Sequence, residues 1–105
     1  MDRDDADDDA DDGRDTEHGV PLRLRVEEVE WREVEGEVVA LDLRQNEYVG
    51  VNRTGAVLWN ALASGATREQ LVALLVERFD VDRGRAGADA DEFLHQLADR
   101  DLLEP

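Results

Sequence analysis

Apolar and polar residues alternate along the chain from Leu22 to Val51, and this alternation predicts β-strands that bury one face. In the first predicted strand the apolar residues stand two apart, at Leu22, Leu24 and Val26 and again at Val29 and Trp31. Glu35-Gly36 then interrupts the pattern. Because glycine adopts turn conformations without steric cost, this pair marks the end of the first strand.

Two shorter strands follow this turn. In the second strand, Val39, Leu41 and Leu43 alternate with Ala40 and Asp42, and Val38 has the opposite phase. After the turn residues Arg44-Gln45-Asn46, the third strand contains Tyr48, Val49 and Val51. Two consecutive hairpins predict a three-stranded antiparallel sheet. So small a sheet needs a second layer that covers one of its faces.

Three helices after Val51 supply this cover. Asn52 or Thr54 can cap a first helix that runs to about Ala63, where Ser64-Gly65 ends it. Thr67 and Gln70 form a capping box at the start of the second helix. Asp82 can cap the third helix, but Gly84 and Gly87 weaken its first turns and favour a later start.

The element order is therefore β-β-β-α-α-α, which predicts an α+β fold. Its three helices resemble a helix-turn-helix core beside a small sheet, as in a winged helix. A winged helix raises the possibility of DNA binding. The third predicted helix, however, displays mainly carboxylates rather than the cations that a recognition helix needs, so DNA binding is only a remote alternative.

The net charge of −16 is concentrated at the N-terminus. Residues 1–18 hold ten acidic residues and two arginines, and Met1 is their only apolar residue larger than alanine. Like charges repel, so we predict a disordered acidic tail over 1–18 and a folded domain over 19–105. A calcium loop does not fit the tail. With Gly13 in the glycine position, two ligand positions fall on Ala10 and Gly19.

The composition excludes several classes of function. The chain contains no Cys, which removes disulfides and thiolate chemistry. The folded part still has a net charge of −8, so neither nucleic acid nor an anionic membrane is a favoured partner. The longest apolar run, Leu71 to Val76, is too short to span a bilayer, and the acidic N-terminus contains no signal peptide. We expect a soluble, cytoplasmic protein.

Catalytic and metal-binding groups are scarce. Ser64 is the only serine, and the histidines are His18 and His95. No nucleophile, base and orienting group can be assembled from them. Asp91 and His95 stand one helical turn apart, but a metal site needs further ligands. We expect no enzyme activity, no cofactor and no metal site.

A peptide is the partner that the third strand favours. If this strand lies at the edge of the sheet, its unpaired backbone groups can bind an added strand. Gly50 would let another chain come close, or would only relieve a twist or a bulge. Tyr48 would either belong to the core or line a groove.

Residues 29–103 resemble the PqqD-like family. The resemblance depends on short elements in a fixed order, namely Leu41-Asp42-Leu43, Tyr48-Val49-Gly50-Val51-Asn52, Thr54-Gly55 with Trp59, Thr67-Arg68-Glu69, Phe79-Asp80-Val81-Asp82, Phe93-Leu94-His95-Gln96-Leu97 and Asp101-Leu102-Leu103. Each element alone is a weak signal, whereas the ordered set is specific. The acidic tail is not part of the family pattern.

The resemblance implies a PqqD-like RiPP recognition element over residues 19–105. Such a domain binds the leader of a ribosomally synthesised precursor peptide and presents it to a modifying enzyme, without chemistry of its own. The Tyr-x-Gly-x-Asn-x-Thr-Gly spacing is most similar to the stand-alone proteins of lasso-peptide biosynthesis, which serve a separate leader peptidase. The alternative is a PqqD-type chaperone for a radical SAM enzyme.

The resemblance also implies where the leader binds. In the family the leader adds antiparallel to the third strand and lies against the third helix. On this chain the implied leader-binding residues are Asn46, Glu47, Tyr48, Val49, Gly50, Val51, Asp89, Phe93, Gln96, Leu97, Arg100 and Leu103. Acidic residues near this groove favour a leader that contains Lys or Arg, mainly through the association rate; they are Glu47, Asp89, Glu92 and Asp99.

Overall fold

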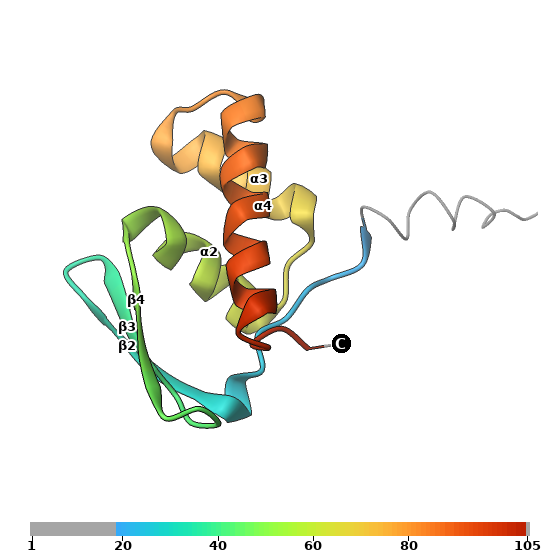
Figure 1. Ribbon diagram of the computed structural model, residues 1–105. Helices are drawn as coiled ribbons and strands as arrows, with labels where there is room; N and C mark the ends of the chain where they lie inside the picture. The colour runs from blue at the N-terminus through green and yellow to red at the C-terminus, as the bar shows by residue number, and fades with distance from the viewer. Residues whose placement is uncertain (1–18, 105) are drawn as a thin grey trace, which may run out of the picture.

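The computed structural model describes residues 19–104, so the predicted disordered tail over 1–18 lies outside the described residues. Three strands form one antiparallel sheet in the order β2 (Val29–Val34), β3 (Glu37–Asp42) and β4 (Glu47–Val51). Three helices lie on one side of this sheet (Figure 1). The predicted α+β arrangement of three strands followed by three helices is confirmed.

The helices begin where their caps predict. The Asn52 side chain accepts a hydrogen bond from Gly55 N at the start of α2 (Arg53–Ser64). The Thr67–Gln70 capping box opens α3 (Arg68–Phe79), and both of its hydrogen bonds are present. Asp82 caps α4 (Arg83–Asp99), and this helix begins directly after its cap. The expected late start of the third helix is therefore wrong, because the Asp82 cap outweighs the weak propensity of the nearby glycines.

The first predicted strand is shorter than its alternating pattern. A 3-10 turn, η1 (Val26–Glu28), interrupts it, and only the part from Val29 onward joins the sheet. Leu22 and Leu24 instead form isolated bridges to Ala66 and Leu103. The segment before η1 therefore runs past the helices, and its backbone forms hydrogen bonds with the C-terminal residues of the domain (Figure 1).

The register shows which face of the sheet is buried. Ala40 stands opposite both Trp31 and Val49, so these side chains share the face that packs on the helices. The alternating set Val39, Leu41 and Leu43 lies on the other face, where Val39 is 44% exposed. Their regular spacing therefore does not mark the buried side of β3, which is formed by Val38, Ala40 and Asp42.

The core lies between the sheet and the three helices. Trp59 of α2 is fully buried at its centre and meets Trp31 edge to face, with ring centroids 5.6 Å apart. Leucines from each helix complete the core, together with Leu24 and Leu102 from outside the helices. No helix within residues 19–104 is long and apolar enough to cross a membrane.

A candidate peptide-binding groove between β4 and α4

Strand β4 is an edge of the sheet. It pairs with β3 on one side, and no strand of the described chain pairs with its other side. Successive side chains of a strand point to opposite faces. Val51 is buried and Val49 is half-buried on the helix side, whereas Tyr48 is 75% exposed on the outer side. The unpaired backbone therefore runs beside two inward-facing valines.

A hollow of about 130 Å³ with a mixed polar and apolar lining lies between β4 and α4. Val49, Gly50, Val51 and Asn52 line it from the strand side, and Phe93, Gln96, Leu97 and Arg100 line it from the helix. These α4 residues recur at spacings of three and four, so they form one face of the helix. We call this space the apolar hollow, after the four apolar side chains Val49, Val51, Phe93 and Leu97.

A second, more polar hollow of about 280 Å³ continues the first one. The two share three lining residues, Asn52, Phe93 and Gln96, so they are parts of one groove. The remaining lining residues of this polar hollow are Thr54, Gly55, Leu58, Arg85, Asp89 and Glu92. The groove thus extends from the free edge of β4 past the start of α2.

The walls of the groove meet at Gly55. A Cβ atom at this buried position would lie 2.6 Å from Val51 Cγ1 and 2.9 Å from Phe93 Cε1. Both distances are far below van der Waals contact. Only glycine therefore lets the first turn of α2 fit between the end of β4 and the middle of α4.

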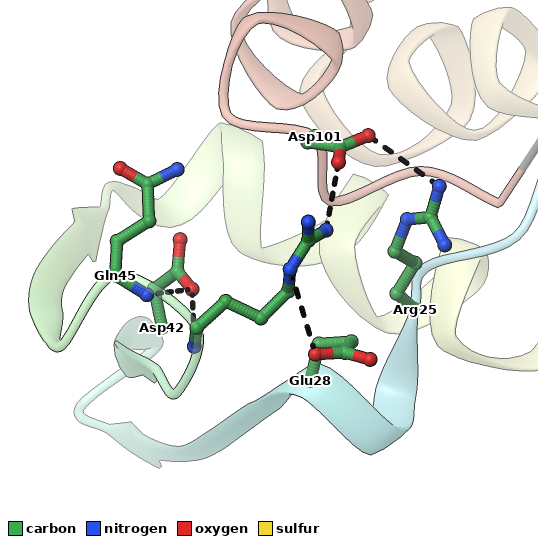
Figure 2. A network of polar contacts seen from close by, with 6 residues as sticks. Arg25, Glu28, Asp42, Gln45 and Asp101 are labelled. Atoms are coloured by element: carbon green, nitrogen blue, oxygen red, sulfur yellow. Dashed lines mark hydrogen bonds and ion pairs between the residues drawn. The ribbon is translucent and has the colours of Figure 1, made fainter.

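A polar network ties the turn before β4 to the end of α4 (Figure 2). Arg44 donates a hydrogen bond of 2.7 Å to Asp101 and lies 3.7 Å from Glu28. Asp101 also accepts a hydrogen bond of 3.4 Å from Arg25. The hydrogen bond from Arg44, together with the nearby positive charge of Arg25, lowers the pKa of Asp101.

The buried carboxylate of Asp42 shapes the same turn. Its Oδ1 accepts hydrogen bonds from Arg44 N at 3.0 Å and Gln45 N at 3.2 Å. This Asx-type turn directs the chain back into β4. Arg100, the residue that caps the C-terminal end of α4, lies 3.5 Å from Glu47 at the first position of β4. The two walls of the groove are therefore linked at this end.

Most of the predicted leader-binding residues line this groove. Those that do are Val49, Gly50, Val51, Asp89, Phe93, Gln96, Leu97 and Arg100. Asn46 lies outside both hollows in the turn, with a left-handed φ of 58°. Glu47 is exposed beside Arg100, and Leu103 packs against the core and bridges to Leu24.

The Tyr48 side chain matches neither of its two predicted placements. It is too exposed for the core, and it lies on the face of β4 that points away from the helices. The reason is the phase of β4, because Val49 and Val51 already occupy the inner face. Only the backbone of Tyr48 lies on the free edge of the sheet.

The predicted leader-binding set did not include six residues at the far end of the groove, namely Asn52, Thr54, Gly55, Leu58, Arg85 and Glu92, although Glu92 was expected near the groove. A signal for two of them was present. Glu92 lies between Asp89 and Gln96 on one helix face, and Arg85 extends that face by one turn. The others lie at the start of α2 or directly before it, and the position of α2 against α4 depends on tertiary packing.

Residues 19–104 contain no group of three or more His, Cys, Asp or Glu side chains that could hold a metal ion. His95 and Ser64 are both exposed, and neither lines the groove. The groove itself presents the unpaired strand edge and the side chains that line the two hollows.

Comparisons with known proteins agree with this geometry. The model of the family "Coenzyme PQQ synthesis protein D (PqqD)" matches residues 37–103. A comparison with curated protein sequences found no match.

Two solved structures are similar to the whole domain. "TbiB1 in Complex with the TbiA(beta) Leader Peptide" is 30% identical, with a TM-score of 0.72, over 78% of this chain and 94% of that chain. "Lasso peptide synthetase B1 complexed with the leader peptide" is 26% identical, with a TM-score of 0.69, over 80% of this chain and 98% of that chain. Both titles describe proteins bound to a leader peptide.

Proposed function

The chain belongs to the PqqD family, and from this premise we propose that it is a RiPP recognition element that binds the leader of a ribosomally synthesised precursor peptide. The observation that supports this most is the free edge of β4 beside a groove lined by α4. The two similar solved structures are complexes with leader peptides. A lasso-peptide precursor is the best-supported source of the leader.

The proposed mechanism is strand addition. Backbone N–H and C=O groups of β4 pair with the leader, which gives affinity with little dependence on sequence. Alternate leader side chains then point toward α4, where the hollows select them by size and polarity. Because a free leader loses conformational entropy when it docks, we expect moderate affinity.

We further propose that the chain changes no covalent bond and delivers the leader to a separate enzyme. A leader peptidase is the expected partner in lasso-peptide maturation. The family match also fits the alternative, a PqqD-type chaperone for a radical SAM enzyme. The genes beside this one distinguish the two, because a leader peptidase and a cyclase point to lasso maturation. A cytoplasmic location stays a prediction.

Pairing of the arginines argues against DNA as the ligand. Arg68 lies 2.7 Å from Asp91, Arg83 lies 2.7 Å from Glu69, and Arg85 lies 3.2 Å from Asp89. Arg100 is held by Glu47. Phosphate binding needs cations that are not already neutralised, and these helices offer few of them.

Strand addition is tested by blocking each edge of the sheet in turn. The hydrogen bond from Leu43 N to Glu28 O sets the alternation of backbone groups along the sheet, so the N–H of Val49 faces β3, whereas the N–H of Tyr48 faces the free edge. Proline lacks a backbone N–H and is tolerated in an edge strand where that N–H faces solvent, so Tyr48→Pro should abolish binding of the cognate leader in a calorimetric titration while the sheet stays paired. Glu33→Pro is the matched control, since the N–H of Glu33 faces the free side of β2, the opposite edge strand. Circular dichroism confirms that each variant is folded. Unchanged binding by a folded Tyr48→Pro variant would reject the strand-addition model.

A further inference from the structure

The two hollows of the groove differ in charge. The apolar hollow has a single charged lining residue, Arg100, and the nearby Glu47 balances it at 3.5 Å. The polar hollow is lined by two carboxylates, Asp89 and Glu92, and by one guanidinium, Arg85. One end of the groove is thus close to neutral, whereas the other holds an excess of negative charge.

Arg85 balances only one of the two carboxylates. Its Nε lies 3.2 Å from Asp89, in an exposed pair one helical turn apart. Glu92 forms no ion pair with any residue of the described chain, 19–104. The carboxylate of Glu92 is therefore the charge in this hollow that a bound cation can pair with.

The position of the polar hollow relative to β4 determines which end of a bound peptide passes this hollow. Asn52 and Thr54, which directly follow β4, line this hollow, so it lies beyond the C-terminal end of the strand. The rest of the sheet is antiparallel, and antiparallel pairing is somewhat more stable than parallel pairing. In an antiparallel leader, the residues on the N-terminal side of the added strand pass the polar hollow.

We propose that the polar hollow selects leaders with a Lys or Arg on the N-terminal side of the apolar residues that occupy the apolar hollow. Glu92 is the main specificity-determining residue, and Asp89 contributes less because it is held by Arg85. The apolar residues of the leader stand two apart, since only alternate side chains of an added strand face α4. This inference depends on the proposed function, because it describes the ligand of the same groove.

The first experiment is a selection that needs no knowledge of the natural leader. A phage-displayed library of random 15-residue peptides is selected on the immobilised full chain at physiological ionic strength. We expect enrichment of peptides with two apolar residues two apart, preceded by Lys or Arg. A parallel selection on Tyr48→Pro should lose both features, whereas a selection on Glu92→Gln should lose only the preceding cation.

The second experiment measures the pairing. An enriched peptide is synthesised with its Lys and with Gln in place of that Lys. The wild-type chain should bind the Lys peptide about three- to fivefold more tightly, which is the upper range for exposed ion pairs. Glu92→Gln should bind both peptides alike. Glu77→Gln makes the same substitution at an exposed position of α3, and Glu77 lines neither hollow, so this control should keep the preference.

The outcomes separate the two proposals. If no peptide with spaced apolar residues is enriched, or if Tyr48→Pro selects the same peptides, the proposed function fails. If such peptides are enriched without a cation, or with the cation on their C-terminal side, only the present inference fails. An equal loss of preference in Glu92→Gln and Glu77→Gln also overturns it, because the effect would then arise from net charge.

Discussion

At the scale of single residues, Gly55 determines how closely β4 and α4 approach each other. Its missing Cβ leaves the space that Val51 and Phe93 occupy, and both of these side chains line the groove. A substitution here affects the packing of the core and the width of the groove together. The position therefore links the stability of the domain to the recognition of its ligand.

Gly55→Ala should destabilise the domain by about 1–3 kcal/mol, the usual cost of forcing extra carbon into a packed site. It should also weaken leader binding, because Val51 or Phe93 must move. Urea unfolding and leader titration measure the two effects.

Gly84→Ala is the control for this substitution. The nearest atom to its Cβ is Asp82 Oδ1 at an ordinary 3.4 Å, so we expect no loss or a gain of up to about 1 kcal/mol. A Gly55→Ala variant as stable as wild type would contradict this interpretation.

Single residues also show where prediction from sequence fails. Both phases of β3 are apolar around Val38 to Leu41, so alternation alone does not decide which face is buried. Asp42 makes the buried face of β3 harder to predict, since a carboxylate usually lies on the solvent-exposed face. Two backbone N–H groups of the following turn donate to its Oδ1 and offset part of the cost of its burial, whereas its Oδ2 is buried without a partner in the described residues. That compensation becomes visible only in three dimensions.

At the scale of elements, the capping residues of the three helices were predictable because capping is local chemistry, although the start of α4 was expected too late. Asn52, Thr67 and Asp82 each accept a backbone hydrogen bond within three residues, so the sequence contains the whole interaction. The interrupted first strand was not predictable in the same way. Its residues pair with Ala66 and Leu103, which are distant in sequence.

The capping box at the start of α3 leads to a prediction about the stability of the domain. Thr67→Ala removes the hydroxyl that accepts from Gln70 N, and it should cost about 1 kcal/mol of the free energy of unfolding. Thr67→Ser keeps a hydroxyl at the same place and should stay close to wild type. Chemical denaturation of the three proteins measures the difference. Equal losses in both variants would show that the methyl group of Thr67, rather than its cap, is what stabilises the helix.

The pairing of α3 with α4 through Arg68 and Asp91 predicts a dependence on pH. Arg68 donates two hydrogen bonds to the Asp91 carboxylate, at 2.7 and 3.0 Å, and these lower the pKa of Asp91. A carboxyl with a lowered pKa stabilises the folded state above its unfolded pKa, about 3.9 for Asp. That contribution is lost as the pH falls through the lower, folded pKa.

Comparison with Asp91→Asn isolates this effect from the other carboxylates. Wild type should be the more stable protein at pH 7, and the difference between the two should shrink as the pH falls below about 4. Denaturation midpoints at a series of pH values from 7 to 3 provide the measurement. A difference that does not change with pH would mean that Asp91 acts through packing rather than charge.

At the scale of the whole molecule, the net charge of −16 has two parts with different consequences. Half of it belongs to residues 1–18, outside the described residues. The other half belongs to a domain whose helices resemble those of a DNA-binding protein. In that domain carboxylates neutralise most arginines of α3 and α4 and leave an excess of negative charge in the groove. A peptide with basic residues suits this surface better than a nucleic acid does.

The groove was predictable in part at this scale. The family resemblance implied β4 and α4 as its walls, and eight of the twelve implied residues line the two hollows. The contribution of α2 depends on how tightly its first turn packs against both walls, which no local pattern in the sequence records. The outward direction of Tyr48 depends on the sheet register for the same reason.

A leader peptide that adds to the free edge of β4 must pair with the backbone of that strand. Residue-by-residue NMR of the full chain, titrated with the leader of the precursor peptide encoded beside its gene, detects this pairing. Strand addition predicts large amide shifts and slowed hydrogen exchange at Glu47–Val51, with further shifts along the groove face of α4 and little change in α3. Saturable binding that leaves the β4 amides unchanged and shifts α3 or β2 instead would contradict strand addition.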